Sequence, residues 1–496
     1  MNEWEARLEG LARLRAASRA MGGPERLARH RGQDKLDARA RVTALVDPGT
    51  FQEIGTLAGG EVPADAIVAG SGLIDGRPVM VGAEDFTTVA GTIGSASNAK
   101  RYRLAELALQ QRIPLVMLLE GAGYRLEERR SRTPVDLIMQ ARCSGSVPIV
   151  TGVLGASAGH GALIAPMSDF CVMTEEAAIF TAGPPVVRQS TGEEVSKADL
   201  GGPAVALGSD LVHNRADDDL AALRQIREYL SYFPSSAWSY PSSRSPEDRT
   251  APRPTPELLD LVPANHRQAY DMRPVIDVIT DSDDWFEVAP EFGPALLCVL
   301  AHLGGHPVAV VASQPNVMAG AIDADAAVKA ARFITVADAF HLPLVFLADN
   351  PGMLPGSQSE RAGVLRNGAR MFAAQTLATT PKIHLTLRKA YGFGSMVMAM
   401  ASFDGQGATF AFPGATLGAM GARAHSAAIG APDGRAAARQ LREAELAASY
   451  ESAEHLRFDE LIDPRETRDA LLAALQRALC ARQAAPEPVR RSMIMP

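Results

Sequence analysis

The sequence contains one long internal repeat. A stretch beginning GLIDGRPVMVGAEDF matches a later stretch beginning VLAHLGGHPVAVVASQ. Matched residues lie 229 positions apart, as in the pairs Pro78 and Pro307, Gly91 and Gly320, Lys100 and Lys329, Pro114 and Pro343, Gly123 and Gly352. A repeat of this length indicates that one folded unit occurs twice, and a chain of 496 residues is too long for a single core.

Further along the chain the repeat continues with an offset of 233 residues. Pro148 in VPIVTGVLG then matches Pro381 in TPKIHLTLR, and GASAGHGAL matches RKAYGFGSM. The three residues Gly159, His160 and Gly161 therefore correspond to Gly392, Phe393 and Gly394. Because the second copy has no histidine, a histidine that serves as acid, base or metal ligand in both copies is excluded. The two loops share their backbone.

Each copy alternates short apolar runs with helical stretches. The runs PVMVGAE, PLVMLLE and PIVTGVLG in the first copy correspond to PVAVVAS, PLVFLAD and KIHLTLR in the second. This alternation predicts an α/β fold with mostly parallel sheets. The segment between the copies is rich in proline and serine. We therefore expect an N-terminal domain over residues 1–240, a linker over 241–265 and a C-terminal domain over 266–496.

Composition narrows the class of partner. The net charge of −8 argues against nucleic acid and against an acidic membrane surface. The cysteines Cys143, Cys171, Cys298 and Cys480 are scattered singly, which fits neither a zinc site nor a disulfide scaffold and favours the cytoplasm. No stretch has the length of a membrane span. We expect no bound metal, no nucleic acid and no membrane partner.

A glycine-flanked turn after a strand has a specific chemical use. Where such a turn opens a helix, the first N–H groups have no partner within the helix and converge on one point. They bind either a phosphate or an oxygen that becomes anionic during a reaction. Neither loop continues as a P-loop, and GxGxxG is absent. A single turn of this kind is more often a packing device, but two equivalent turns suit a reaction between two carbonyl compounds.

A second candidate loop follows the apolar run that ends at Glu120. The carboxyl end of a strand is where α/β sheets tend to bind ligands. The loop supplies five candidate substrate-binding residues, which are Gly121, Ala122, Gly123, Tyr124 and Arg125. Arg125, together with Arg129 and Arg130, is a candidate for phosphate binding; the alternative is a solvated charged face shared with the neighbouring glutamates.

Several long blocks resemble one known family. They include GGPERLARHRGQDKLDARARVTALVDPGTFQEI, TAGPPVVRQSTGEEVSKADLGG, YDMRPVIDVI, AGAIDADAAVKAARF, DNPGMLPGSQSERAGVLRNGARM and RKAYGFGSMVM. Along essentially its whole length the chain resembles the carboxyltransferase subunits of biotin-dependent acyl-CoA carboxylases, of the propionyl-CoA and methylcrotonoyl-CoA carboxylase β type.

The resemblance implies a fold and a reaction. The fold is a pair of crotonase-like (ClpP/crotonase) domains with a spiral core of ββα units. Active sites form where the N-terminal half of one subunit meets the C-terminal half of another, in homo-oligomers from dimer to hexamer. Carboxybiotin arrives on a separate carrier from a biotin carboxylase and carrier partner. The biotin nitrogen removes the α-proton of the acyl-CoA, and the enolate is carboxylated.

The resemblance also implies roles for the loops. N–H groups around Gly159 to Gly161 form one oxyanion hole and those around Gly392 to Gly394 the other. The family more often has Gly-Gly where this chain has Gly159-His160, and Gly-Gly-Ala at residues 392–394. Met396 stands where propionyl-type members have an acidic or aliphatic residue, and Tyr124 resembles the methylcrotonoyl type. An acyl chain other than acetyl or propionyl is consistent with these departures.

Two further functions stay open at this point, and a third is disfavoured. The same fold can run in reverse, decarboxylating a malonyl-type CoA thioester and passing the carboxyl group to biotin. A non-catalytic assembly subunit is the second alternative, because His160 or Phe393 would close the pocket if its side chain filled it. A stand-alone hydratase or isomerase needs facing carboxylates, for which the sequence offers no convincing pair.

Overall fold

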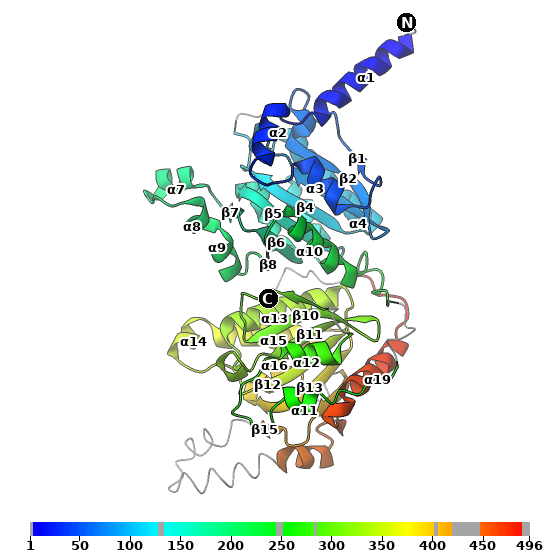
Figure 1. The fold of residues 1–496 in the computed structure, drawn as a ribbon, viewed down its shortest axis with the longest axis vertical. Coiled ribbons are helices and arrows are strands. Elements are labelled where there is room, and N and C mark those ends of the chain that lie inside the picture. Colours follow the sequence, from blue (N-terminus) through cyan, green and yellow to red (C-terminus); the bar gives the residue numbers. More distant parts are fainter. Residues whose placement is uncertain are drawn as a thin grey trace. The chain divides into compact units, whose positions relative to one another are not determined.

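The structure is a computed structural model in which the chain forms two compact units (Figure 1). The first unit runs to Ser231 and the second includes Ser239–Pro486. Between them, Tyr232–Pro234 belong to the second unit and Ser235–Trp238 to the first. The segment expected as a linker therefore lies within the second unit, where Thr255 donates its N–H to the Arg465 carbonyl. The predicted domain limits themselves stay a prediction. The structure describes residues 3–126, 133–244, 251–281, 285–400, 405–418 and 447–488.

The first unit is built on one sheet with the order β1-β2-β3-β4-β5-β6-β8, while β7 pairs with β5. The strands β1 to β3 are antiparallel, and the rest of the sheet is parallel. The strands are β1 Gln52–Glu53, β2 Ile67–Ile74, β3 Arg77–Glu84, β4 Leu115–Gly121, β5 Ile149–Ala158, β6 Phe170–Thr174, β7 Ala178–Phe180 and β8 Asn214–Ala216.

The second unit repeats this sheet strand for strand. Its order is β9-β10-β11-β12-β13-β14-β16, and β15 pairs with β13 just as β7 pairs with β5. The strands are β9 Trp285–Val288, β10 Leu296–Leu303, β11 His306–Ser313, β12 Leu344–Asn350, β13 Lys382–Tyr391, β14 Gln406–Ala411, β15 Thr416–Gly418 and β16 Glu460–Leu461. The duplicated α/β fold predicted from the sequence is confirmed.

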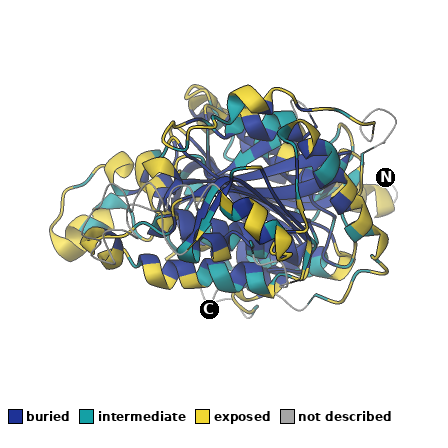
Figure 2. Cartoon of the chain, turned by 90° about the horizontal axis from the view of Figure 1, so that it is seen from below, coloured by how far each residue is buried: buried dark blue, intermediate teal, exposed yellow. Residues whose placement is uncertain are grey.

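Helices cover both sheets, and Figure 2 shows buried strands inside helices with exposed outer faces. Among the described helices, none is long and apolar enough to cross a membrane. The α-helices are α1 Glu3–Arg19, α2 Pro24–Arg31, α3 Ala38–Leu45, α4 Ser95–Gln111, α5 Asp136–Cys143, α6 Ile164–Met167, α7 Pro184–Thr191, α8 Lys197–Gly201, α9 Pro203–Gly208, α10 Asp219–Tyr232, α11 Leu258–Leu261, α12 Arg273–Ile279, α13 Ala324–Ala339, α14 Ser357–Arg361, α15 Val364–Leu377, α16 Gly392–Val397 and α19 Thr467–Cys480. The short 3-10 helices are η1 Pro63–Ala66, η2 Val89–Gly91, η3 Gly159–Leu163, η4 Met318–Gly320 and η5 Pro464–Glu466.

The matched lysines of the repeat have a structural role. The Lys100 ammonium donates to the carbonyls of Ala64 and Ile67 at 2.9 and 2.6 Å, and the Lys329 ammonium donates to the Ala289 carbonyl at 3.1 Å. Both lysines are buried on the helix that follows the matched 3-10 turn of their unit, α4 after η2 or α13 after η4. Burial lowers the pKa of Lys100 to about 8. Each lysine therefore ties its helix to backbone carbonyls outside that helix.

The central strands β4 and β12 are buried at every residue, as expected for parallel strands covered on both faces. Both lose regular register with the next strand at the same point, between Leu119 and Gly121 in the first unit and between Ala348 and Asn350 in the second. The irregularity lies where the strand becomes the candidate loop. An interrupted ladder frees the backbone to turn there.

Candidate functional site

The two glycine-flanked turns begin with the same backbone conformation. In the first unit β5 leads into η3 at Gly159, and in the second β13 leads into α16 at Gly392. Both glycines are left-handed, with φ of 57° and 54°, a conformation in which a side chain is disfavoured. The first N–H groups of each helical turn have no partner within it. Two similar clusters of donors thus stand at the same position in the two units.

Backbone hydrogen bonds fix the loop after the central strand in the same way in both units. The Ile93 N–H donates to the Gly123 carbonyl at 2.8 Å, and the Arg125 N–H donates to the Ile93 carbonyl at 2.9 Å. In the second unit Ile322 makes the same pair of bonds with Gly352 and Leu354, at 3.1 and 2.8 Å. The sequence therefore identified a loop whose backbone position is duplicated.

Strained turns that the sequence reasoning missed support these loops. Ala90 in η2 and Ala319 in η4 are both left-handed, each with φ of 55°. The Ala90 carbonyl accepts the Ala122 N–H at 2.9 Å. Left-handed alanine costs on the order of 1–3 kcal/mol and persists only where the surroundings impose it. Because alanine carries no turn signal, only the repeated sequence around Gly91 and Gly320 pointed to this feature.

The glycines leave little room at the turns. A Cβ on Gly394 would lie 2.3 Å from the Asn350 side-chain oxygen, and a Cβ on Gly161 would lie 3.1 Å from a carboxylate oxygen of Glu84. A Cβ on Gly123 would lie 3.1 Å from the Ala158 carbonyl. The two loops of the first unit are thus in close contact, and residue 394 admits no side chain without displacement of Asn350.

The His160 ring begins a buried chain of charged groups. Its Nε2 lies 2.5 Å from Oδ1 of Asp136, and Oδ2 of Asp136 accepts from Nε of Arg101 at 2.6 Å. Arg101 also donates to Oε1 of Glu84 at 2.6 Å, and Oε2 of Glu84 accepts the Glu120 N–H at 2.9 Å. We call His160, Asp136, Arg101 and Glu84 the His160 relay. It connects the turn at residues 159–161 to the start of the loop at 121–125.

The relay fixes the charge of its central carboxylate. Burial alone would raise the pKa of Asp136, but the charge of Arg101 and hydrogen bonds from His160 and Arg101 outweigh burial and lower the pKa to about 2. Burial raises the pKa of Glu84, against the opposing effects of Arg101 and the Glu120 N–H. Asp136 is therefore ionised at neutral pH and accepts hydrogen bonds from both neighbours.

Two predicted substrate-binding side chains lie on the loop after β4. The Tyr124 ring is 40% exposed and meets the His160 ring edge-on, with centroids 5.6 Å apart. The Arg125 guanidinium pairs with Asp65 at 2.7 Å and donates to the Thr92 carbonyl at 2.9 Å. Arg129 and Arg130 lie outside the described residues. The structure thus brings Tyr124 and His160 together and gives Arg125 an internal partner.

The second turn has a phenylalanine in place of His160 and lacks counterparts of Glu84 and Arg101. The Phe393 ring lies 5.7 Å from the Phe372 ring of α15. By the repeat, Ser313 and Ala330 replace Glu84 and Arg101. Met396 on α16 is 46% exposed, and its carbonyl accepts from the Gln375 side chain at 3.0 Å. The two turns share their backbone and differ in the side chains around it.

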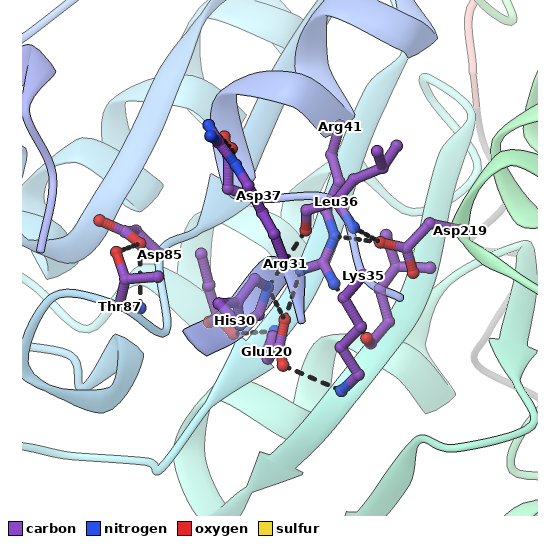
Figure 3. Close-up of polar contacts among 12 residues, drawn as sticks. His30, Arg31, Lys35, Leu36, Asp37, Arg41, Asp85, Thr87, Glu120 and Asp219 are labelled. Atoms are coloured by element: carbon purple, nitrogen blue, oxygen red, sulfur yellow. Dashed lines mark hydrogen bonds and ion pairs between the residues drawn. The ribbon is translucent and has the colours of Figure 1, made fainter. Parts of the chain in front are cut away.

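Each unit also buries one acidic side chain at the end of its central strand. Glu120 is held by Arg41 at 2.6 Å and Lys35 at 3.1 Å, with His30 3.6 Å away (Figure 3). Its counterpart Asp349 is held by Arg388 at 2.6 Å and by the Tyr270 hydroxyl at 2.9 Å. Because each carboxylate is buried and paired with a cation, both are structural ties under the loops.

No group of three histidine, cysteine, aspartate or glutamate side chains in the described segments is arranged to hold a metal ion. The roles of Gly121, Ala122 and Gly123, of both glycine turns and of Met396 in catalysis or binding stay predictions.

Comparison with known proteins identifies the family. The carboxyl transferase domain family matches residues 29–493. The methylmalonyl-CoA carboxyltransferase 12S subunit of Propionibacterium freudenreichii subsp. shermanii is 36% identical, over 97% of this chain and 96% of that protein. The biotin-dependent long chain acyl-coenzyme A carboxylase beta4 subunit of Mycobacterium tuberculosis is 35% identical, over 93% of this chain and 92% of that protein.

A solved structure agrees with both units. The crystal structure of transcarboxylase 12S, described as a hexamer with hydrolysed methylmalonyl-coenzyme A bound, superposes with a TM-score of 0.91 at 34% identity and covers 99% of each chain. The resemblance inferred from the sequence is confirmed. The chain belongs to the carboxyl transferase family and is an acyl-CoA carboxyltransferase of the kind found in biotin-dependent acyl-CoA carboxylases.

Proposed function

We propose that this chain transfers a carboxyl group between biotin, carried on a separate protein, and the α-carbon of an acyl-CoA, with one glycine turn serving each reactant. The observation that carries the proposal is the duplicated turn. Gly159 and Gly392 have nearly the same left-handed φ at the same position of two matching sheets. Two reactants that each develop negative charge on an oxygen need two such donor clusters.

The residues present fit a biotin-dependent reaction. When bound, carboxybiotin supplies both the carboxyl group and the base that removes the α-proton. The protein then has to supply oxyanion donors and alignment. N–H groups at residues 159–161 and 392–394 hold the carbonyl oxygens, and losing one such donor typically costs about 2.7–4 kcal/mol. Holding both reactants in line lowers the activation free energy further through proximity and orientation.

The acyl-CoA contacts the loop after β4 in this proposal. Gly121, Ala122 and Gly123 bring the backbone close to the ligand, and Tyr124 lines the acyl pocket. Met396 lines the pocket beside the second turn. Arg125 is the candidate ligand for a CoA phosphate. Its guanidinium already pairs with Asp65, so it either holds the phosphate and Asp65 together or leaves Asp65 when the phosphate binds. The name of the 12S relative, methylmalonyl-CoA carboxyltransferase, supports a malonyl-type thioester as the carboxylated form.

Assembly is part of the proposal. The 12S relative is described as a hexamer in a multienzyme core. We propose that this chain likewise forms a homo-oligomer and works with a biotin carboxylase and a biotin carrier. The same site catalyses both directions, so the carboxylase and the biotin-linked decarboxylase share every residue named here.

Carboxyl transfer to free biotin tests the proposal. The purified chain is incubated with malonyl-CoA or methylmalonyl-CoA, with and without biotin, and the decarboxylated thioester is quantified. We expect thioester loss that depends on biotin. Longer and branched malonyl analogues then define the acyl pocket. No biotin-dependent transfer with any thioester, from protein that is folded and oligomeric, contradicts the proposal.

A further inference from the structure

The His160 relay is not needed by the reaction proposed above. That reaction takes its base from biotin and needs only backbone donors at residues 159–161. Yet the structure holds the His160 ring with a hydrogen bond to an aspartate that is fully buried. A second charged residue, Arg101, is itself 1% exposed and orients that aspartate. A buried charged network is costly to maintain unless each member is paired, and backbone donors alone do not account for this one.

The relay determines which ring nitrogen carries the proton. With its pKa at about 2, Asp136 is ionised and can only accept. The proton in the His160–Asp136 contact therefore belongs to Nε2 of the ring. In the neutral imidazole this leaves a lone pair on Nδ1. This is the arrangement by which an orienting carboxylate prepares a histidine base in many enzymes.

The second nitrogen is available. Within the described part of the chain, His160 Nδ1 has no hydrogen-bond partner, and the side chain is 17% exposed. The groups that face the ring are Asp136 from α5 and Tyr124 from the loop after β4. The ring stands on the turn that the loop after β4 contacts at Ala158. Because the proposed function places the acyl-CoA on that loop, we assign the thioester oxygen to the N–H groups of this turn. A base beside an oxyanion site is suited to removing a proton α to that carbonyl.

The second unit provides an internal contrast. Its turn has Phe393 in place of His160, and Ala330 in place of Arg101. Its aromatic ring packs on Phe372. The shared function of the two turns is therefore carried by the backbone, while the ionisable ring belongs to one turn only.

We propose that His160, held by Asp136, transfers protons at the α-carbon of a bound acyl-CoA, so that this chain exchanges the α-hydrogens of an acyl-CoA with solvent in the absence of biotin. This inference rests on the proposed function for the place where the thioester binds. Nδ1 takes the α-proton as the C–H bond breaks, and the electron pair forms an enolate whose oxygen is held by the N–H groups of residues 159–161. Nδ1–H exchanges with solvent, and the proton returns to carbon. The acyl-CoA is regenerated, and no oxidant or cosubstrate is consumed.

Deuterium incorporation tests the inference. The full-length chain is incubated in D2O with propionyl-CoA and no biotin, and the mass of the acyl group is followed. Exchange well above the rate without protein is expected. His160→Gln keeps an N–H donor for Asp136 but has no basic nitrogen, and His160→Phe carries the residue of the second turn. Both should lower the exchange rate at least about a hundredfold. Asp136→Asn should lower it by a smaller factor, because the ring loses its orientation.

A parallel assay separates this inference from the proposed function. Biotin-dependent carboxyl transfer is measured on the same preparations, and propionyl-CoA binding is verified by its shift of the unfolding temperature. The exchange rate in His160→Gln should fall at least about tenfold more than its transfer rate. Asp338→Asn, at a buried carboxylate of the second unit that accepts from the N–H groups of Thr379 and Thr380 and from the Thr379 hydroxyl, controls for general destabilisation.

The outcomes are distinct. Transfer with no exchange, from protein that binds propionyl-CoA, overturns the proton-transfer role and leaves the proposed function intact. Exchange without transfer supports the role of His160 and contradicts carboxyl transfer. Exchange in His160→Gln at the wild-type rate overturns the inference.

Discussion

Arg388 in the second unit occupies the strand position of Gly155 in the first. The ladders place both next to the acidic residue of the central strand, since Leu119 pairs with Val153 and Ala348 with Thr386. A Cβ on Gly155 would lie 2.3 Å from the Glu120 carboxyl group, whereas Arg388 reaches Asp349 at 2.6 Å. The second unit therefore supplies the cation from the neighbouring strand. The first unit has a glycine at that strand position and supplies the cation from α3, as Arg41.

This relationship predicts that the two units lose stability in different ways. Arg388→Met removes the guanidinium 2.6 Å from the buried Asp349 carboxylate and leaves Lys389 3.6 Å from its other oxygen, which should cost about 3 kcal/mol. Gly155→Ala should be comparably damaging through overlap with Glu120, although it removes no interaction. Chemical denaturation with a fluorescence probe measures both, and Arg388→Lys, which keeps a cation, is the matched control. Equal stability of Arg388→Met and wild type would contradict the structural role assigned to this pair.

The two turns should differ in their tolerance of alanine. At Gly394 the new Cβ would lie 2.3 Å from Asn350 and 2.6 Å from the Gly352 backbone, whereas at Gly161 the nearest atoms are 3.1 and 3.3 Å away. Gly394→Ala should therefore displace the second turn and lower carboxyl transfer by about a hundredfold or more. Gly161→Ala should have a smaller effect. Biotin-dependent transfer rates on folded oligomer measure both, and the reverse order would contradict the packing described.

His160 variants should separate the ring from its backbone. His160→Pro removes the N–H of residue 160 and should cost on the order of 3 kcal/mol in the activation free energy of carboxyl transfer if that donor is used. His160→Ala keeps the donor and should retain more activity than the proline variant. The comparison requires steady-state transfer kinetics. Equal rates for the two variants would mean that the N–H of residue 160 is not a donor in the reaction.

The repeat in the sequence accounts for most of what could be predicted. Offsets of 229 and 233 residues placed Gly123 against Gly352 and Gly159 against Gly392, and the structure gives each pair the same backbone. A repeat conserves strand order and turn geometry because both copies must bury the same sheet. The family was indicated separately, by long blocks of sequence that occur in both units.

The His160 relay could not be predicted in the same way. Its members come from β3, α4, α5 and η3, so no local pattern connects them, and the second copy lacks Glu84 and Arg101 counterparts. The sequence leaves Arg125 open between phosphate binding and a solvated charged face, because its partner Asp65 lies 60 positions away. Contacts between distant charged residues depend on the folded packing, which a sequence pattern does not specify.

The ionisation of Asp136 predicts a pH dependence of stability. Its pKa is about 2 in the folded chain against an ordinary value of 3.8. A lowered carboxyl pKa stabilises the folded state above the ordinary value, and this contribution of about 2 kcal/mol disappears as the pH falls through the folded value. The difference in unfolding free energy between wild type and Asp136→Asn should therefore be constant near neutral pH and shrink between about pH 4 and pH 2. A difference independent of pH would contradict the relay.

Arg125 gives a test of the loop after β4. Its guanidinium pairs with Asp65, which is 1% exposed, and also holds Thr92, so Arg125→Gln should loosen the loop and leave a buried carboxylate without its cation. If the same side chain also binds a CoA phosphate, the dissociation constant for propionyl-CoA should rise about tenfold, as expected for loss of one charged hydrogen bond. Asp65→Asn provides the control, because it breaks the internal pair and keeps the cation.

Binding measured by calorimetry distinguishes the two roles. Weaker binding in Arg125→Gln alone indicates direct phosphate contact, equal weakening in both variants indicates positioning of the loop, and an unchanged dissociation constant in Arg125→Gln removes Arg125 from the substrate site.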